Sequence, residues 1–377
     1  MHAIVARLRR ASLGALMLLA ALPLAMPAVP ADAATLPVTG YVWANDSTSA
    51  HYTPQHQFNG SSWLPAFAAT AGHNSQGVYT VTFPGMAVAG GIAHATAFGS
   101  GTQQCKVKNW GPVAPGSPDL RVLVRCFNLN GTPADSMFMA SFTAQSGILP
   151  NAMAYLLADQ PTAASYTASS PYSFNSKGVL NTITRTGVGA YTARLGGVGA
   201  SGGHGHVQVT AYGDGSERCT VAQWVPMSVG FGVVHEDVSV RCFSVSGAPA
   251  DSMFTLTYVD RVSLDGVATD LYGGGYLWAE QPSTASYVPN LLYQWSSKGL
   301  VNSVQRVGTG RYAVNFPGQD PRSGAVQVTA YGTTSSAFCK VVDMATISRI
   351  GVQCFDTHGT PLDSQFDVTQ FTPGWLL

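Results

Sequence analysis

Residues 241–254 read RCFSVSGAPADSMF, and the same pattern occurs at residues 125–138 (RCFNLNGTPADSMF) and at residues 353–366 (QCFDTHGTPLDSQF). The copies repeat at a spacing of about 115 residues, which is the length of a domain and not of a solenoid unit of ~20–50 residues. A unit of that length can bury a core of its own. The sequence therefore predicts three tandem copies of one domain.

Two further motifs precede the cysteine motif in every copy. A short apolar segment opens each copy, and a Gly-x-Tyr segment follows it; they begin at Gly40, Ala154 and Gly275, and at Gly77, Gly189 and Gly310. The segment Val207–Tyr212 (VQVTAY) returns unchanged as Val326–Tyr331. Three motifs in a fixed order show that whole domains are repeated, and not one short element alone.

The repeated segments alternate apolar and polar residues with period two, as half-buried strands do. Within 238–242, for example, the valines and the cysteine share one face, whereas Ser239 and Arg241 take the other. Gly and Pro punctuate the gaps, and no long capped helix is visible after residue 34. We expect an all-β protein of three tandem antiparallel β-sandwich, jelly-roll-like domains, at residues 35–150, 151–270 and 271–377.

All six cysteines lie in the repeats, two in each copy. The alternation places both cysteines of a copy on its apolar face, where they can meet. Six cysteines allow 15 connectivities, and recurrence at equivalent positions favours the pairs within copies: Cys105–Cys126, Cys219–Cys242 and Cys339–Cys354. Each disulfide would close a loop of roughly 15–23 residues and contribute on the order of 3 kcal/mol in the chain-entropy model.

The first 34 residues have the pattern of a secretory signal peptide. Arg7, Arg9 and Arg10 precede an apolar run over residues 13–24, and Ala31-Asp32-Ala33 is a small-x-small cleavage signature. The apolar run is shorter than the ~20 residues of a membrane span, and no second long run follows it. We expect a secreted, extracellular protein that is not inserted in a membrane.

The low and balanced charge of the chain argues against nucleic acid as a binding partner. The whole chain has 19 basic and 19 acidic residues, and removal of the signal takes away three arginines and one aspartate, leaving 16 and 18. Charged residues make up 10% of the chain, against a usual ~25%. There is no basic stripe of the kind that binds nucleic acid and no charged tail. No motif calls for a cofactor.

The repeated grouping Gly-x-Tyr-Thr-Val-x-Phe, Val-x-Val-Thr and Gly-x-Pro-Ala-Asp-Ser-x-Phe resembles the last strands of bacterial secreted β-sandwich repeats. These in turn are similar to the C1q/TNF-type jelly roll found at phage tail-fibre tips. The resemblance covers about two thirds of each copy and does not include the cysteines; copy one departs most, over Asn59–Gln76. It implies a binding head that assembles as a trimer.

The sequence offers no catalytic constellation. No histidine recurs at an equivalent position in all three copies, as the base of a triad repeated in every copy would. His204-Gly205-His206 could hold a metal only if a third ligand converged on it, so we interpret it as a solvated loop and expect no metal site. The recurring Asp135, Asp251 and Asp363 are interpreted as structural residues of a turn.

Trp110 and Trp224 follow the first cysteine of their copies by five residues, where copy three has Met344. An aromatic ring on a strand can stack on a sugar, and it can equally pack a core or a domain interface. The two tryptophans are therefore candidate ligand-stacking residues.

We expect a non-enzymatic secreted protein that binds an extracellular glycan or cell-surface polymer, or that has a structural role at the surface. One alternative is a lectin-like protein, which predicts an exposed aromatic patch on at least two copies. The other is a secreted hydrolase, which predicts a deep pocket with a histidine and a carboxylate in one copy.

We further expect a monomeric chain whose three copies pack with pseudo-threefold symmetry. The rival arrangement is a row, which lacks contact between copies one and three.

Overall fold

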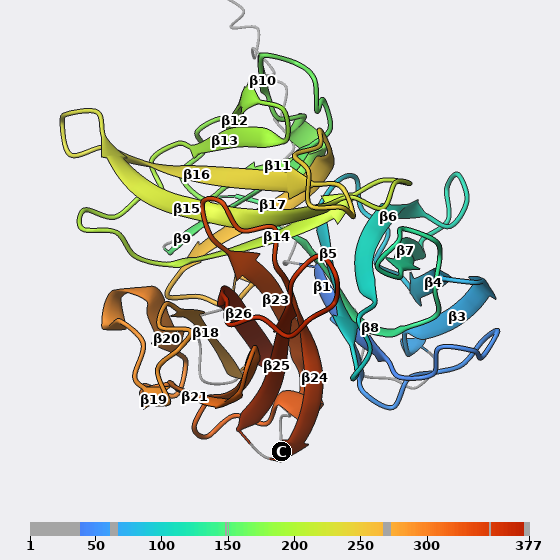
Figure 1. Cartoon of the computed structure of the whole chain (residues 1–377). Coiled ribbons are helices and arrows are strands. Elements are labelled where there is room, and N and C mark those ends of the chain that lie inside the picture. The colour runs from blue at the N-terminus through green and yellow to red at the C-terminus, as the bar shows by residue number, and fades with distance from the viewer. Residues whose placement is uncertain are drawn as a thin grey trace, which may run out of the picture. The chain divides into compact units, whose positions relative to one another are not determined.

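The strands of the three copies follow one another in the same order (Figure 1). The structure is a computed structural model that describes residues 38–60, 67–147, 149, 151–266, 273–346 and 348–372; the predicted signal peptide at residues 1–34 lies outside them. Copy one contains β1 (Val38–Ala44), β2 (Gln57–Asn59), β3 (Thr70–Ser75), β4 (Val78–Phe83), β5 (Ile92–Phe98), β6 (Gln104–Pro112), β7 (Leu120–Phe127) and β8 (Met137–Ala144).

Copy two contains β9 (Ala152–Ala158), β10 (Ser165–Thr167), the short 3-10 helix η2 (Ser170–Tyr172), β11 (Ser173–Asn175), β12 (Thr182–Gly187), β13 (Ala190–Leu195), β14 (His206–Tyr212), β15 (Arg218–Ser228), β16 (Val234–Phe243) and β17 (Met253–Asp260). Copy three contains β18 (Gly273–Ala279), β19 (Ser286–Tyr287), η3 (Leu291–Tyr293), β20 (Gln294–Ser296), β21 (Ser303–Gly308), β22 (Arg311–Asn315), η4 (Pro321–Ser323), β23 (Ala325–Tyr331), β24 (Phe338–Thr346), β25 (Arg349–Phe355) and β26 (Gln365–Thr372). The described part of the chain contains no helix with the length and hydropathy that a membrane span requires.

Each copy builds a sandwich from two antiparallel sheets. The first sheet of a copy contains its opening strand, in the orders β2-β1-β8-β5, β11-β9-β17-β14 and β20-β18-β26-β23. The second sheet contains the cysteine strands, in the orders β3-β4-β7-β6, β10-β12-β13-β16-β15 and β19-β21-β22-β25-β24. The predicted fold class, three tandem β-sandwiches, is confirmed.

The sheets do not end at the boundaries between copies. The last strand of each second sheet pairs in parallel with the edge strand of a first sheet in another copy: β6 with β14, β15 with β23, and β24 with β5. A backbone hydrogen bond follows each pair, from Gly213 to Val107, from Gly332 to Val221 and from Gly99 to Val341, over 2.9–3.0 Å. The contacts thus run from copy one to two, from two to three and from three back to one.

Burial follows two different patterns in the two kinds of sheet. In the second sheet of copy one, β4 and β7 alternate buried and partly exposed residues as expected. The strands β5, β14 and β23 are instead buried on both faces. The expectation that these strands have a solvated polar face was therefore wrong, because that face meets the neighbouring copies.

The three disulfides form within copies, as predicted. They join Cys105 to Cys126, Cys219 to Cys242 and Cys339 to Cys354. In each copy the two cysteines are direct cross-strand partners, on β6 and β7, β15 and β16, or β24 and β25. Each disulfide therefore anchors the strand that reaches over to the next copy.

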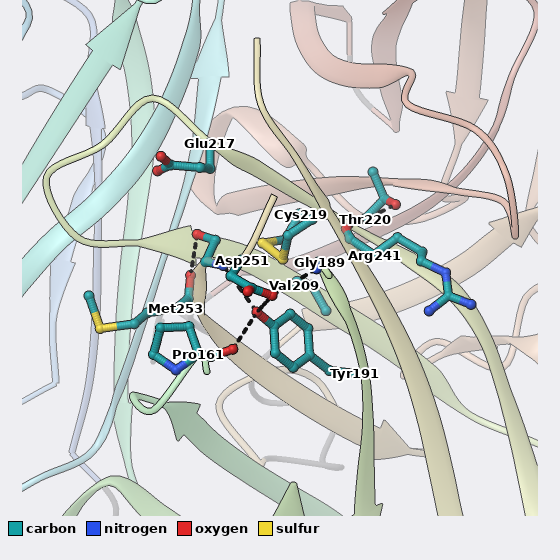
Figure 2. The surroundings of a disulfide bond; sticks show 12 residues. Pro161, Gly189, Tyr191, Val209, Glu217, Cys219, Thr220, Arg241, Asp251 and Met253 are labelled. Atoms are coloured by element: carbon teal, nitrogen blue, oxygen red, sulfur yellow. Dashed lines mark hydrogen bonds between the residues drawn. A yellow bond between two sulfur atoms is a disulfide. The ribbon is translucent and has the colours of Figure 1, made fainter. Parts of the chain in front are cut away.

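A partly exposed aspartate ties the Gly-x-Tyr motif to the cysteine motif in every copy. In copy two, Asp251 Oδ1 accepts hydrogen bonds from Gly189 N at 2.8 Å and from Tyr191 Oη at 3.1 Å (Figure 2). The hydroxyl of Tyr191 also accepts from the N–H of Ser252 at 3.1 Å. Asp135 and Asp363 repeat these contacts. The interpretation of the aspartates as structural residues agrees with this geometry.

The glycine that donates to the aspartate must adopt a left-handed backbone conformation. Gly77, Gly189 and Gly310 have φ between 61° and 65°, and a Cβ atom there would lie 2.4–2.6 Å from the carbonyl oxygen of a cysteine. Only glycine fits such a position without strain.

The side chain that pairs with the aspartate varies between copies. It is Arg185 in copy two and Arg306 in copy three, but His73 in copy one.

Replacement of Asp251 tests this tie. The hydrogen bond from Arg185, followed by those from Gly189 and Tyr191, lowers the pKa of Asp251 below its usual value. A carboxylate with a depressed pKa in the folded state contributes stability at neutral pH, and the contribution is lost as the pH falls below about 4 through that pKa. We expect Asp251→Ala to lower the free energy of unfolding at pH 7 by about 1–3 kcal/mol.

The control is Asp214→Ala. Asp214 also pairs with an arginine, Arg125, but the side chain of Asp214 is 69% exposed, so this pair lies in solvent. We expect a loss below about 1 kcal/mol there. Denaturant unfolding of both variants at pH 7 and pH 3 provides the measurement, and equal losses at pH 7 would show that the tie is no stronger than a surface ion pair.

Candidate functional site

Three equivalent threonines link the copies where β5, β14 and β23 meet. Thr96 accepts a hydrogen bond from the N–H of Val328 at 3.1 Å, and Thr329 accepts one from the N–H of Val209 at 3.1 Å. The hydroxyl of Thr210 lies 3.0 Å from His94 Nδ1. Each threonine thus contacts a different copy. We call this region the three-copy junction.

The interior of the junction is polar and fully buried. His94 also contacts the hydroxyl of Thr257 through Nε2 at 2.8 Å, and burial lowers the pKa of His94 to about 3. His206 Nδ1 lies 3.8 Å from Asp367 Oδ1. Burial lowers the pKa of His206 to about 3 and raises that of Asp367 well above its usual value. Burial therefore favours the neutral forms of all three groups.

A pocket of about 70 Å³ lies at one end of the junction, next to the disulfides. Its walls contain the three linking threonines and the first cysteine of each copy, Cys105, Cys219 and Cys339. A site of ~10–15 Å³ holds one water, so this junction pocket has room for several waters or for one small polar group. Gln104 and Glu217 line it and are partly accessible to solvent.

One basic side chain from each copy lines the junction pocket and contacts the next copy. Lys106 Nζ lies 3.4 Å from Glu217 Oε2, so copy one contacts copy two. Arg218 donates to the carbonyl of Ser336 at 3.0 Å, so copy two contacts copy three. Lys340 donates to the carbonyl of Gly101 at 2.9 Å, which completes the cycle.

Burial perturbs all three cations. It lowers the pKa of Lys340 to about 8 and that of Arg218 to about 10. It also lowers the pKa of Lys106, although Glu217 partly offsets the effect. The shifts reflect the cost of removing a positive charge from water.

The candidate stacking residues Trp110 and Trp224 are buried, at 7% and 5% exposure. The ring of Trp110 packs against Tyr172 and Tyr212 of copy two at 5.6 and 5.4 Å. Trp224 packs in the same way against copy three, with Tyr331 at 5.6 Å. In this arrangement neither indole offers a free face to a sugar, and both rings seal contacts between copies.

The His204-Gly205-His206 segment differs from the solvated loop that we expected. His206 opens β14 and is 1% exposed, with its ring stacked on Tyr276 at 5.4 Å. His204 lies 3.8 Å from Asp260 and is also largely covered. Among the described residues, no group of three or more His, Cys, Asp or Glu side chains is placed to hold a metal ion.

The sequence reasoning missed Lys106, Arg218 and Lys340. A signal was present, since a lysine follows the first cysteine in copies one and three. The alternation places that lysine on the face opposite the cysteine, and the sequence does not show what covers this face. In the structure the opposite face is covered by another copy, and Lys106 and Lys340 are 3% and 1% exposed.

No family model, curated protein or solved structure matches this chain.

Removal of one linking hydroxyl tests the junction. Besides accepting from the N–H of Val209, Thr329 Oγ1 donates to the carbonyl of the same residue at 2.9 Å. Thr329→Val keeps the shape and leaves a buried N–H without its partner, so we expect the free energy of unfolding to fall by about 1–3 kcal/mol. The control is Thr184→Val on the exposed face of β12, with a change below about 0.5 kcal/mol. Denaturant unfolding measures both, and an equal response would contradict the assigned role of Thr329.

Proposed function

We propose that the mature chain is a secreted, non-enzymatic binding protein that holds an extracellular glycan or cell-surface polymer at the junction pocket. The main support for the proposal is that residues from all three copies line the pocket. Each copy contributes a threonine, a disulfide-bonded cysteine and a basic side chain to the same small cavity. No single copy contains the site, which gives a reason for the presence of three copies in one chain.

Secretion is supported by the signal-peptide pattern and by the disulfides. Three disulfides use every cysteine of the chain, and no free cysteine occurs among the described residues. Disulfides of this kind persist in oxidising compartments outside the cytosol. The low charge and the abundance of short polar residues suit an extracellular β protein.

The geometry favours binding at a polar pocket over the two alternatives. A lectin of the aromatic type needs exposed rings at equivalent places in two copies. Among the described residues, the exposed aromatic side chains are Phe67 and Phe231, and these positions are not equivalent. A hydrolase needs an accessible histidine beside a carboxylate. Partly exposed pairs of this kind are His73–Asp135 at 2.9 Å and His204–Asp260 at 3.8 Å. Asp135 is held by Gly77 and Tyr79 as part of the structural contacts of copy one, and the described lining of the junction pocket contains no histidine.

A glycan and cell-wall polymer array on the purified mature protein tests the proposal. The matched variant is Gln104→Phe, because copy three already has Phe338 at the equivalent position and the larger ring should occupy the junction pocket. We expect the wild-type protein to bind a defined subset of polymers and Gln104→Phe to lose at least most of that signal. Gln160→Phe, at an exposed position, serves as the control and should bind normally. Absence of any binding, or unchanged binding by Gln104→Phe, would contradict the proposal.

A further inference from the structure

The junction pocket carries an excess of buried positive charge. Lys106, Arg218 and Lys340 are 3%, 6% and 1% exposed. Glu217 is the one acidic residue in the described lining, and its side chain is 33% exposed. Three cations therefore face one carboxylate.

Two of the three cations lack an acidic partner. No salt bridge of Arg218 or Lys340 occurs within the described ranges; both donate to backbone carbonyls instead. The Nη2 atom of Arg218 is buried and has no hydrogen-bond partner there. An isolated buried charge is costly unless it is paired, and an unused buried donor adds to that cost.

We propose that the junction pocket binds an oxyanion, namely a sulfate, phosphate or carboxylate group carried by the extracellular polymer. The inference rests on the proposed function and specifies the chemistry of its ligand. The anion supplies the negative charge that two of the three cations lack. It also gives the free Nη2 donor of Arg218 an acceptor.

The three side chains suit this task in different ways. Arg218 has a planar guanidinium whose donors match an oxyanion in a fixed geometry. It also packs over the ring of Phe338, 5.5 Å from the ring centroid, which holds its orientation. Lys106 and Lys340 act as point charges on flexible stems. The three side chains come from three different copies. A bound anion would therefore also link the copies to one another.

Isothermal titration with sodium sulfate tests the inference, with sodium chloride at equal ionic strength as the reference titrant. We expect saturable binding of one sulfate per chain. Lys340→Met removes a buried charge and should weaken the affinity about tenfold, the effect of one charge-assisted hydrogen bond. Lys340→Arg keeps the charge and should restore binding at least in part.

The control variant is Arg349→Met, which removes an exposed cation at the start of β25 and should bind sulfate as the wild type does. Circular dichroism and thermal unfolding establish that each variant is folded. Failure of the wild type to bind sulfate, or equal binding by Lys340→Met, would overturn the inference.

The pH dependence provides a second readout. Lys106, Glu217 and Arg218 face the same pocket as Lys340, whose pKa burial lowers to about 8. Sulfate keeps its charge between pH 7 and pH 9, so its affinity should fall over this range as Lys340 loses its proton. Lys340→Arg should show a smaller fall, and an identical profile would argue against a role for Lys340.

Polymer arrays separate this inference from the proposed function. Binding to sulfated dextran but not to uncharged dextran, with loss in Lys340→Met, supports both. Equal binding to uncharged polymers by the wild type and Lys340→Met overturns the oxyanion inference and leaves the binding function standing. Binding of free sulfate through Lys340 without binding of any polymer supports the oxyanion site and overturns the proposed function.

Discussion

The parallel pairing of strand edges between copies is the constraint on which the rest of the structure depends. An unpaired strand edge is a hazard, because its backbone groups remain available to other chains. Here β6, β15 and β24 each cover the edge of a first sheet in another copy. The pairing brings the polar faces of β5, β14 and β23 together. There Thr96, Thr210 and Thr329 make hydrogen bonds to other copies, whereas the buried side chains of His206 and Gln208 have no hydrogen-bond partner in the described part of the chain. The linking threonines and the junction pocket both follow from this arrangement.

Two separate sets of contacts hold the structure together. The aspartate tie lies within a copy: Asp251 contacts Gly189, Tyr191 and Arg185 of its own sandwich. The junction contacts lie between copies and draw on polar and charged groups. The aspartate recurs in all three copies, whereas the basic residues of the pocket occupy different positions: Lys106 and Lys340 follow the first cysteine of their copies, and Arg218 precedes it.

Recurrence made the sandwich and the disulfides predictable from the sequence. A cysteine at equivalent positions in three copies, on an apolar face each time, limits the pairing strongly. The strands β4 and β7 follow the period-two pattern. The polar residues of the first sheets could not be placed in this way. Alternation separates the two faces of a strand, but it does not show whether the polar face meets water or another part of the protein. Gln208 and Thr210 lie on such a polar face and are buried.

The candidate site could not be predicted from the sequence for the same reason. Lys106 and Lys340 are visible as a recurring lysine, but their meaning depends on which copy covers them. Trp110 and Trp224 were predicted as candidate ligand-stacking residues, but their rings are buried between copies. Contacts between segments far apart in the chain set the environment of each residue. No local pattern encodes these contacts, so the pocket became visible only with the structure.

Small-angle X-ray scattering of the mature protein tests the central claim most directly. The pairing of β24 with β5 brings copy three against copy one, and a row of domains lacks this contact. The account predicts a maximum dimension well below that of three sandwiches placed end to end, and a scattering profile that fits a closed cycle of copies. A maximum dimension equal to that of three sandwiches in a row would contradict it.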